Sequence, residues 1–354
     1  MTERKLNRGL RLMALLLICL LLTGCAKAPE GSAQPGILPT AKADDRPDPT
    51  KKTTGVGFYF DTVVTLTLWG APETLVEEVW TACARYEQLL SKTVAGSDVS
   101  RINQAGGETV TVDPETWEIL RRAKEISALT GGAFSITIAP VSALWTFTGV
   151  ETNTIPTDEA RLAALPLVDD QKIELGENNT VTLPAGMQID LGGIAKGYIA
   201  DMVAALIREK AHAGIISLGG NVYTVGTKPD GSSFSVGITD PHAKNNYMAV
   251  LYTGDSTVVT SGTYERGFNF GGVRYHHILD PQTGWPAQSD LVSATFVMES
   301  SMTADALATA CIVIGSGKSL ELAASQGVDA LFIKQDGTVL CTEGFKEKYN
   351  YRQP

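Results

Sequence analysis

Two neighbouring segments in the C-terminal part of the chain decide the fold class: 301-SMTADALATACIVIG-315 and 328-VDALFIKQDGTVLC-341. The first predicts a helix over 301–314, because Gly315 readily adopts the backbone conformation that ends helices. The second predicts a β-hairpin that turns at Asp336-Gly337, a dipeptide typical of two-residue hairpin turns. A helix beside an antiparallel hairpin is typical of an α+β protein rather than of a doubly wound parallel sheet.

The rest of the chain shows the same mixture of helices and strands. The alternation of Thr65 and Thr67 with apolar residues predicts a half-buried strand over 58–69. Asp113-Pro114-Glu115 predicts a helix start, because aspartate caps helices and proline suits the first helical position. The helix that starts at 113–115 is expected to end at 131–132. The other expected elements are a helix over about 72–90, a hairpin over 172–183 turning at 178–179, a helix over 197–212, and short strands from 214 to 297. We therefore predict an α+β fold with a mixed or antiparallel sheet and flanking helices.

Composition and charge narrow the function classes. The chain has 354 residues, of which 44% are hydrophobic, so it is long enough to bury a substantial core. Its formal net charge of -10 argues against a nucleic-acid partner, because binding phosphates requires clustered lysine and arginine. No Gly-x-Gly-x-x-Gly follows a predicted strand, so a Rossmann-type nucleotide site is not supported. The spacing of Cys83, Cys311 and Cys341 fits no metal or disulfide framework, and we expect the first two to be buried free thiols.

The N-terminus has the pattern of a lipoprotein signal. Four basic residues among the first eleven precede an apolar run over 12–22, followed by Leu22-Thr23-Gly24-Cys25. This pattern predicts a signal peptide over 1–24, lipidation of Cys25 and attachment to the outer side of the cell membrane. A plain signal peptide or an uncleaved anchor is the alternative. Residues 25–54 are rich in proline and poor in large apolar groups, which predicts a disordered tether before a folded domain over 55–354.

Three segments contain residues suited to chemistry. Asp305 and Thr309 lie four apart on a predicted helix, so their oxygens share one face and could hold a hard cation such as Mg²⁺. The alternative is a solvated aspartate and a threonine bonded to its own helix. The segment 189-IDLGGIAKG-197 places two glycines before a helix, where free N–H groups can bind anions; a tight turn that needs glycine for its geometry explains it equally well. The adjacent pair His276-His277 could supply a general base, or one histidine could be a core residue and the other solvated.

In order, these segments resemble the family of FAD:protein FMN transferases across nearly all of residues 55–345. The matching blocks are FDTVVTL (60–66), SDVSRIN (97–103), GAFSITIAP (132–140) with the Leu144-Trp145 that follows, IDLGGIAKGYIAD (189–201), ISLGGN (216–221), SGTYERGF (261–268), YHHILDPQTGWP (275–286) and ADALATA (304–310). Eight blocks in the same order argue against a chance match, and the lipoprotein signal also fits this family.

The resemblance implies a two-lobed single catalytic unit with FAD in the cleft. The residues implied to lie along FAD are Phe60, Thr93, Ala133, Phe134, Ser135, Asp190, Lys196 and Leu279 through its backbone. Asp305, Thr309 and the carbonyl of Gly193 are implied to hold Mg²⁺, and His277 resembles the family's candidate base. The implied reaction transfers FMN from FAD to a serine or threonine hydroxyl and releases AMP. The implied acceptors are extracytoplasmic flavoproteins of quinone-reductase or related electron-transfer complexes.

Three positions depart from the family pattern. The family usually has aspartate at the position of Ser135 and at that of Thr263, and often tyrosine at that of Thr93. The last change removes one stacking contact with the nucleotide, and the loss of the carboxylate at 135 alters cofactor contacts. We expect function to survive, because the segments implied to hold the metal and the base are intact.

Three other functions compete with the transferase. An FAD pyrophosphatase would use the same site with water as the acceptor, and the sequence does not separate the two. A non-enzymatic flavin-binding lipoprotein would not need Asp305, Thr309 and His277. A solute-binding transport lipoprotein would need two lobes of alternating strands and helices, which the sequence does not show.

Overall fold

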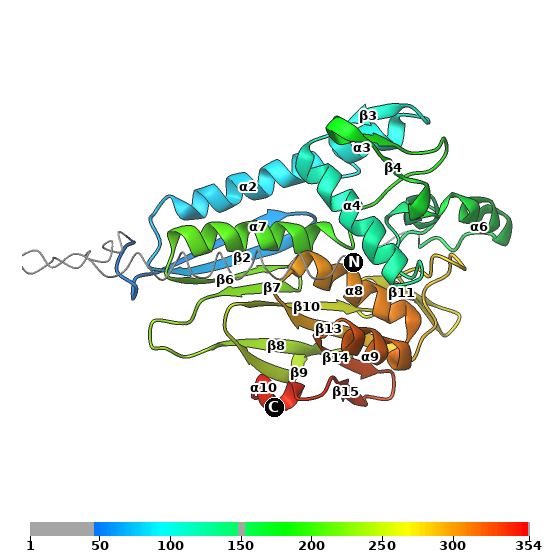
Figure 1. Ribbon diagram of the computed structural model, residues 1–354. Helices are drawn as coiled ribbons and strands as arrows, with labels where there is room; N and C mark the ends of the chain where they lie inside the picture. Colours follow the sequence, from blue (N-terminus) through cyan, green and yellow to red (C-terminus); the bar gives the residue numbers. More distant parts are fainter. Residues whose placement is uncertain (1–45, 148–152, 353–354) are drawn as a thin grey trace, which may run out of the picture. The chain divides into compact units, whose positions relative to one another are not determined.

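An eight-stranded antiparallel sheet runs through the folded domain, and helices cover one of its faces (Figure 1). The structure is a computed structural model that describes residues 46–147 and 153–352. In spatial order the strands are β1 (Lys52–Tyr59), β2 (Thr62–Trp69), β6 (Ala213–Leu218), β7 (Asn221–Val225), β10 (Ser256–Gly262), β13 (Leu291–Met298), β14 (Asp329–Lys334) and β15 (Val339–Cys341). Each neighbouring pair is antiparallel, which confirms the predicted α+β class.

Smaller strand groups and the helices surround this sheet. The smaller groups are β3 (Thr109–Thr111) with β5 (Thr180–Thr182) and β4 (Glu174–Leu175), β8 (Phe234–Asp240) with β9 (Ala243–Thr253), and β11 (Gly267–Phe270) with β12 (Val273–His276). The α-helices are α2 (Leu75–Leu90), α3 (Asp98–Gln104), α4 (Pro114–Leu129), α5 (Ala139–Ser142), α6 (Asp158–Ala164), α7 (Ala195–Lys210), α8 (Ser301–Ile314), α9 (Ser316–Ser325) and α10 (Phe345–Lys348). Short 3₁₀ helices span Ile136–Ile138, Leu165–Leu167, Asp170–Lys172 and Glu177–Asn179.

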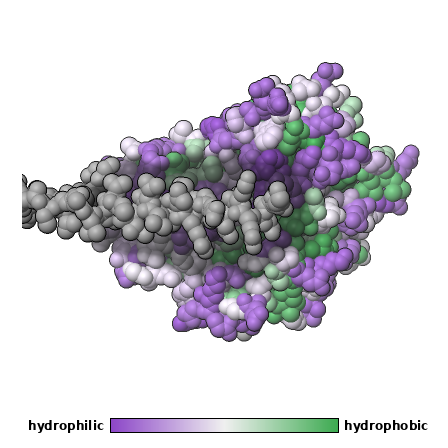
Figure 2. Space-filling model, viewed as in Figure 1, coloured by the Kyte–Doolittle hydropathy of each residue, from purple (hydrophilic) through white to green (hydrophobic). Residues whose placement is uncertain are grey.

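Two apolar cores lie on the two faces of the large sheet. On one face α2, α7 and α8 pack against the strands, and Ile216, Val259 and Leu307 belong to this core. On the other face the β8–β9 hairpin and α10 cover the sheet through residues such as Val236 and Phe345. The domain is therefore layered, with helices on one side of the sheet and a hairpin on the other (Figure 1). Its visible face in Figure 2 is mostly hydrophilic, with separate smaller apolar areas.

The local signals for helix ends are confirmed. The carboxylate of Asp113 accepts a hydrogen bond from the Glu115 N–H, and Pro114 occupies the first turn of α4. Helix α8 ends at Gly315, whose φ of 81° is a conformation that favours glycine. The hairpin turn at Asn178 and Asn179 also forms, with φ values of 55° and 58°.

The predicted single strand over 58–69 is wrong. The chain reverses at Phe60 and Asp61, which both have a φ of 55°, and this two-residue turn separates β1 from β2. The alternation of Thr65 and Thr67 with apolar residues lies wholly within β2 and does not extend to the turn, and phenylalanine rarely adopts a positive φ, so the turn was not expected. On the β1 side, Gly55 and Gly57 leave room for the ring of Trp80 from α2.

The tether prediction is wrong at its end, because β1 begins at Lys52 and pairs in register with β2. Upstream, the Arg46 guanidinium donates a hydrogen bond to the Ala211 carbonyl at 2.8 Å. The predicted signal peptide over 1–24 and Cys25 lie outside the described residues. Within the described ranges, no helix combines the length and apolar character needed to cross a membrane. Cys83 and Cys311 are buried free thiols, as predicted.

Candidate functional site

Close packing of α7 against α8 positions Asp305. A Cβ atom at Gly197 would lie 2.2 Å from the Ser301 carbonyl oxygen, so only glycine allows this approach. The carboxylate of Asp201 on α7 accepts hydrogen bonds from the N–H groups of Ser301 and Met302, at 2.7 and 3.0 Å. These contacts fix the first turn of α8, one turn before Asp305.

Asp305 is buried between the two helices. Its side chain is 4% exposed, and its Oδ2 atom accepts a hydrogen bond from the Gly197 N–H at 3.1 Å. The ammonium group of Lys196 lies 3.6 Å from the same oxygen. Lys196 also donates to the Gly192 carbonyl at 3.0 Å, which ties the glycine turn to the carboxylate.

Thr309 lies on the next turn of α8 and faces Gly193. A Cβ at Gly193 would be 3.6 Å from Thr309 Oγ1 and 3.2 Å from the ring of Phe134. The Thr309 hydroxyl donates to the Asp305 carbonyl at 3.2 Å and lies 3.3 Å from the Ser261 hydroxyl. The three residues implied to bind metal therefore meet at one place, together with the predicted flavin neighbour Phe134. The Thr309 hydroxyl also makes the hydrogen bond to its own helix that the alternative interpretation predicted.

This donor set fits a magnesium ion that keeps much of its own water. Asp305 Oδ1 makes no hydrogen bond within the described residues, so one oxygen of this carboxylate is available to a cation. No group of three or more histidine, cysteine, aspartate or glutamate residues in the described part could hold a metal. Mg²⁺ binds through one or two carboxylates together with substrate phosphates and water, so it does not need such a group.

A second lysine approaches the site through Asp190. The ammonium group of Lys92 lies 2.6 Å from Asp190 Oδ2, and the Asp190 N–H donates to the Ile136 carbonyl at 2.7 Å. The segments 133–137 and 189–193 are thereby joined. Lys92 and Lys196 bring positive charge to this part of a strongly acidic chain, which favours an anionic ligand.

Ser135 binds a buried carboxylate that the sequence analysis did not identify. The Ser135 hydroxyl donates to Asp170 Oδ1 at 2.6 Å, and Asp170 is only 2% exposed. The same carboxylate accepts hydrogen bonds from the N–H groups of Ile136 and Thr137 and from the Thr137 hydroxyl. Asp170 therefore fixes the backbone that follows the implied flavin contacts at 133–135.

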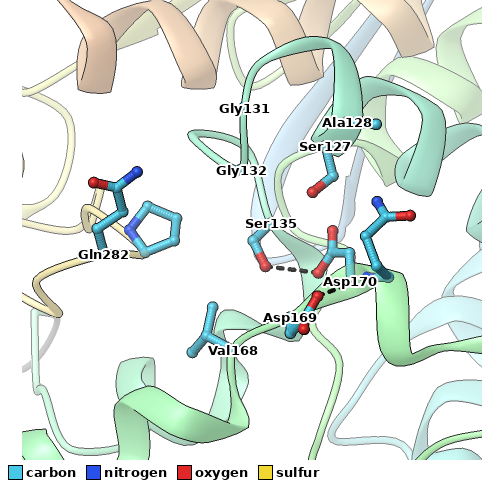
Figure 3. Close-up of a pocket in the computed structure, with 11 residues that line it drawn as sticks. Ser127, Ala128, Gly131, Gly132, Ser135, Val168, Asp169, Asp170 and Gln282 are labelled. Carbon is cyan, nitrogen blue, oxygen red and sulfur yellow. Dashed lines mark hydrogen bonds between the residues drawn. The ribbon is translucent and has the colours of Figure 1, made fainter.

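Two neighbouring pockets lie beside the 130–135 segment, which contains Ser135. Figure 3 shows Ser135 and Asp170 on one wall of a pocket of about 300 Å³, with Gln282 opposite them. A second pocket of about 570 Å³ shares Gly131 and Gln282 with the first and extends to Lys318 and Glu321 of α9. Residues of the 130–135 segment therefore line both pockets.

His276 and His277 occupy different environments at the end of β12. His276 is 5% exposed, and its Nε2 atom lies 3.1 Å from the Ala287 carbonyl. His277 is partly exposed, and its Nδ1 atom lies 3.3 Å from the Arg266 carbonyl. Burial lowers the pKa of each imidazole to about 4, and for His277 the charges of Arg266 and Lys196 act in the same direction. At neutral pH His277 is therefore an uncharged imidazole that can accept a proton.

The remaining residues implied to lie along FAD make no hydrogen bond with Asp305, Thr309 or Gly193 in the described part of the chain. The Phe60 N–H donates to the Glu87 carboxylate of α2 at 2.7 Å, and Thr93, just beyond the C-terminal end of α2, follows the Lys92 that pairs with Asp190. Ala133 is buried beside Phe134. Leu279 is buried and forms an isolated bridge with Pro286.

Sequence reasoning assigned no role to Lys92, Asp170, Asp201 or Ser261. Asp201 and Ser261 lie within the quoted blocks 189–201 and 261–268, so a signal existed for them. Asp170 and Lys92 lie outside every block, and their partners are 35 and 98 residues away in the chain.

Comparison with known proteins identifies one family. The model of the ApbE family matches residues 60–332. The FAD:protein FMN transferase of Treponema pallidum is 39% identical over 292 residues, covering 77% of this chain and 80% of that protein. The transferase of the same name from Klebsiella pneumoniae is 34% identical, covering 78% and 87%. The crystal structure of the ApbE protein from Thermotoga maritima superposes with a TM-score of 0.78 at 33% identity, covering 84% of this chain and 99% of that one. The flavin transferase ApbE from Vibrio cholerae gives a TM-score of 0.77 at 28% identity, with the same coverage.

Proposed function

The chain belongs to the ApbE family of FAD:protein FMN transferases, and from that premise we propose that it uses Mg²⁺ and a serine or threonine hydroxyl as acceptor, and releases AMP. The observation that carries the proposal is the meeting of Asp305, Thr309 and Gly193 beside Lys196. These residues come from the start of α7 and from α8, and they form a site suited to a cation with an anionic substrate.

The proposed reaction replaces one phosphoryl bond with another. The acceptor oxygen forms a bond to the phosphorus on the riboflavin side of the FAD pyrophosphate, while the bond from that phosphorus to the bridging oxygen breaks. AMP leaves with the bridging oxygen. His277 takes the hydroxyl proton, because its imidazole is neutral at physiological pH.

The residues around the pyrophosphate would place positive charge next to its phosphoryl oxygens. When bound, Mg²⁺ would offset the negative charge that develops on the phosphoryl oxygens. Asp305, Thr309 and the Gly193 carbonyl would hold this ion. Lys196 is fixed by Asp305 and the Gly192 carbonyl, so its positive charge is positioned before substrate binds.

We also propose that Cys25 is lipidated and that the domain acts outside the cytoplasm, near the membrane. This follows from the 22–25 motif and from the basic and apolar segments before it. Its acceptors would be flavoproteins of quinone-reductase or related electron-transfer complexes. A Cys25→Ser variant should then leave the membrane fraction, and its retention there would contradict the proposed anchor.

The transfer reaction can be tested with the purified chain lacking residues 1–25, which precede the described domain. The protein is incubated with FAD, Mg²⁺ and a flavin-acceptor domain. We expect an acceptor band that stays fluorescent on a denaturing gel, and AMP in equal amount. Both should disappear with EDTA.

Asp305→Asn is the informative variant, because asparagine keeps an oxygen for the Gly197 N–H and removes only the charge. It should reduce labelling by roughly a hundredfold or more, since it removes charge stabilisation from the transition state. Asp240→Asn on β8 is the matched control and should label at the normal rate. AMP without a labelled acceptor would instead support the pyrophosphatase, and bound FAD without either product would support a flavin-binding protein.

A further inference from the structure

Asn221, the first residue of β7, lies on the helix-facing side of the large sheet. It pairs with Leu218 of β6 and with Val259 of β10, and both of these side chains belong to the core beneath α7 and α8. Directly opposite residues in an antiparallel sheet point to the same face. The carboxamide of Asn221 therefore points toward the helices that carry the candidate site.

Contacts along α8 show which part of that helix lies over Asn221. At the start of α8, the Thr257 hydroxyl donates to the Ser301 hydroxyl at 2.9 Å. Further along, the hydroxyls of Ser261 and Thr309 are 3.3 Å apart. Val259 is midway between Thr257 and Ser261, as Asp305 is midway between Ser301 and Thr309. Eight helical residues and four strand residues both span about 12–13 Å, so α8 and β10 advance by equal distances between these two contacts. Asp305 therefore lies over Val259.

On the neighbouring strand β7, Asn221 pairs with Val259, so it lies at the same height along the strands as Asp305. Helix α7 packs on β6 and β7, and its first turn carries Lys196 and Gly197 to Asp305. The carboxamide thus lies on the face of the sheet beneath the junction where Lys196, Gly197 and Asp305 meet.

The amide nitrogen of Asn221 has no hydrogen-bond partner among residues 46–147 and 153–352. The residue is 2% exposed, and its Nδ2 atom is shielded from solvent and makes no hydrogen bond to any described residue. An NH₂ group can only donate, so its partner must be an acceptor. Folded proteins leave few buried donors unpaired, and each exception calls for an explanation, such as a catalytic role, an ion or water. The missing partner is therefore an acceptor that is not part of the described chain.

We propose that the Asn221 carboxamide donates a hydrogen bond to a phosphoryl oxygen of bound FAD. A phosphoryl oxygen fits because it is an acceptor and because the groups at this level, Lys196 and a carboxylate suited to a cation, suit a pyrophosphate. This inference rests on the proposed function for the identity of the ligand. It adds a binding residue from a part of the chain that the implied FAD and metal residues do not include.

The test separates ligand binding from folding by measuring both in the same variant. Asn221→Val removes the unpaired amide and places a β-branched apolar residue in a buried strand. The melting temperature of the ligand-free variant should equal or exceed that of the wild type, because a buried unsatisfied group is removed. The Kd for FAD with Mg²⁺, measured by flavin fluorescence, should rise roughly tenfold or more, the usual effect of losing a hydrogen bond to a charged group.

Asn221→Asp provides a second variant of almost the same shape. It replaces the donor by a carboxylate, which should weaken FAD binding more than valine does, because like charges repel. Ser256→Ala is the matched control: among the described residues Ser256 also has a buried side-chain oxygen without a hydrogen-bond partner, but it is the first residue of β10 and pairs with Thr224 instead of Asn221. Its FAD affinity should change less than about twofold, because its hydroxyl does not lie opposite Val259, where Asn221 is placed.

A purely structural role predicts the opposite pattern. If Asn221→Val lowers the melting temperature while the Kd for FAD stays unchanged, the inference is overturned. An unchanged Kd in Asn221→Asp overturns it as well, even if the valine variant does not fold. The readout needs no turnover, so a wild type that binds FAD but labels no acceptor would refute only the proposed function. A wild type that does not bind FAD would refute both.

Discussion

The hydrogen bond between Ser135 and Asp170 changes the meaning of the departure at position 135. The family pattern has aspartate there, and its loss suggested a weaker contact with the cofactor. In the structure, however, Asp170 already places a carboxylate 2.6 Å from the Ser135 hydroxyl. The hydroxyl is a donor to this buried group, so serine is suited to its surroundings.

Restoring the family residue should therefore be harmful. Ser135→Asp would bring a second carboxylate against Asp170 and remove one of its donors. We expect the free energy of unfolding to fall by roughly 1–3 kcal/mol, the usual cost of disturbing a buried hydrogen-bonded group. Urea denaturation at neutral pH would measure it, and FAD affinity should not improve.

Two further variants identify the cause. Ser135→Asn has a similar size without the charge and should be less destabilised. Adding Asp170→Asn to Ser135→Asp should recover part of the loss, because one of the two charges is gone. If Ser135→Asp is as stable as Ser135→Asn, charge repulsion is not the reason for serine at this position.

At single residues, the sequence was informative only where the chemistry is local. Asp305 and Thr309 could be paired from their spacing on one helix face, and the structure places them together. Asp170 and Lys92 could not be found this way, because their partners are distant in the chain and no spacing rule connects them. Asn221 stood in a quoted block, yet its significance depends on an unpaired atom that only the packed structure reveals.

At the scale of elements, Asp201 joins the two helices that form the site. It lies on α7 and accepts hydrogen bonds from two backbone N–H groups at the start of α8. Burial raises the pKa of its carboxyl group to about 6. Because it holds the start of α8 against α7, the Asp201 side chain positions Asp305 indirectly.

Removing this carboxyl should destabilise the pair more than neutralising it. In Asp201→Ala two backbone donors lose their acceptor, and we expect a loss of roughly 2–3 kcal/mol. Asp201→Asn keeps one acceptor oxygen and avoids burying a charge, so its loss should be below about 1 kcal/mol. Chemical denaturation at pH 7.5 compares them. If Asp201→Ala is as stable as Asp201→Asn, the cap that Ser300 provides is sufficient to hold the start of α8.

Elements with local end signals could be predicted, and those without them could not. Asp113 and Pro114 marked the start of α4, and Gly315 marked the end of α8. The turn at Phe60 and Asp61 was missed because its positive φ values are atypical for phenylalanine. Its conformation depends on tertiary contacts, among them the hydrogen bond from the Phe60 N–H to Glu87. Helix α9 was missed because it begins at Ser316, directly after the glycine that ends α8.

For the whole molecule, the sequence supported the fold class and left the strand order open. Hairpins and helices each have local signals, so an antiparallel α+β protein could be expected. The neighbours β2–β6 and β7–β10 are far apart in sequence, and their pairing depends on which apolar faces share a core. For the same reason the α7–α8 contact, which builds the site, was not predictable from either helix alone.

The pH dependence of global stability gives a test of the packing near β12. In the folded state, burial lowers the pKa of His276 to about 4, against 6.5 for an exposed imidazole. Between these values the unfolded chain binds more protons than the folded one, so stability rises with pH. The contribution of His276 is fully present above pH 6.5 and is lost as the pH falls toward 4.

His276→Gln isolates this contribution. Glutamine keeps a donor that can reach the Ala287 carbonyl, but it does not titrate. Between pH 6 and 4.5 the free energy of unfolding of the wild type should fall more steeply than that of the variant, by about 1.4 kcal/mol per pH unit, the value for one proton. Titrating groups away from His276, such as Asp201, are present in both proteins and cancel in the difference. Urea denaturation across this range measures the two slopes. Parallel slopes would mean that His276 takes up its proton in the folded protein as readily as in the unfolded chain, and that the packing beside Ala287 is open to water.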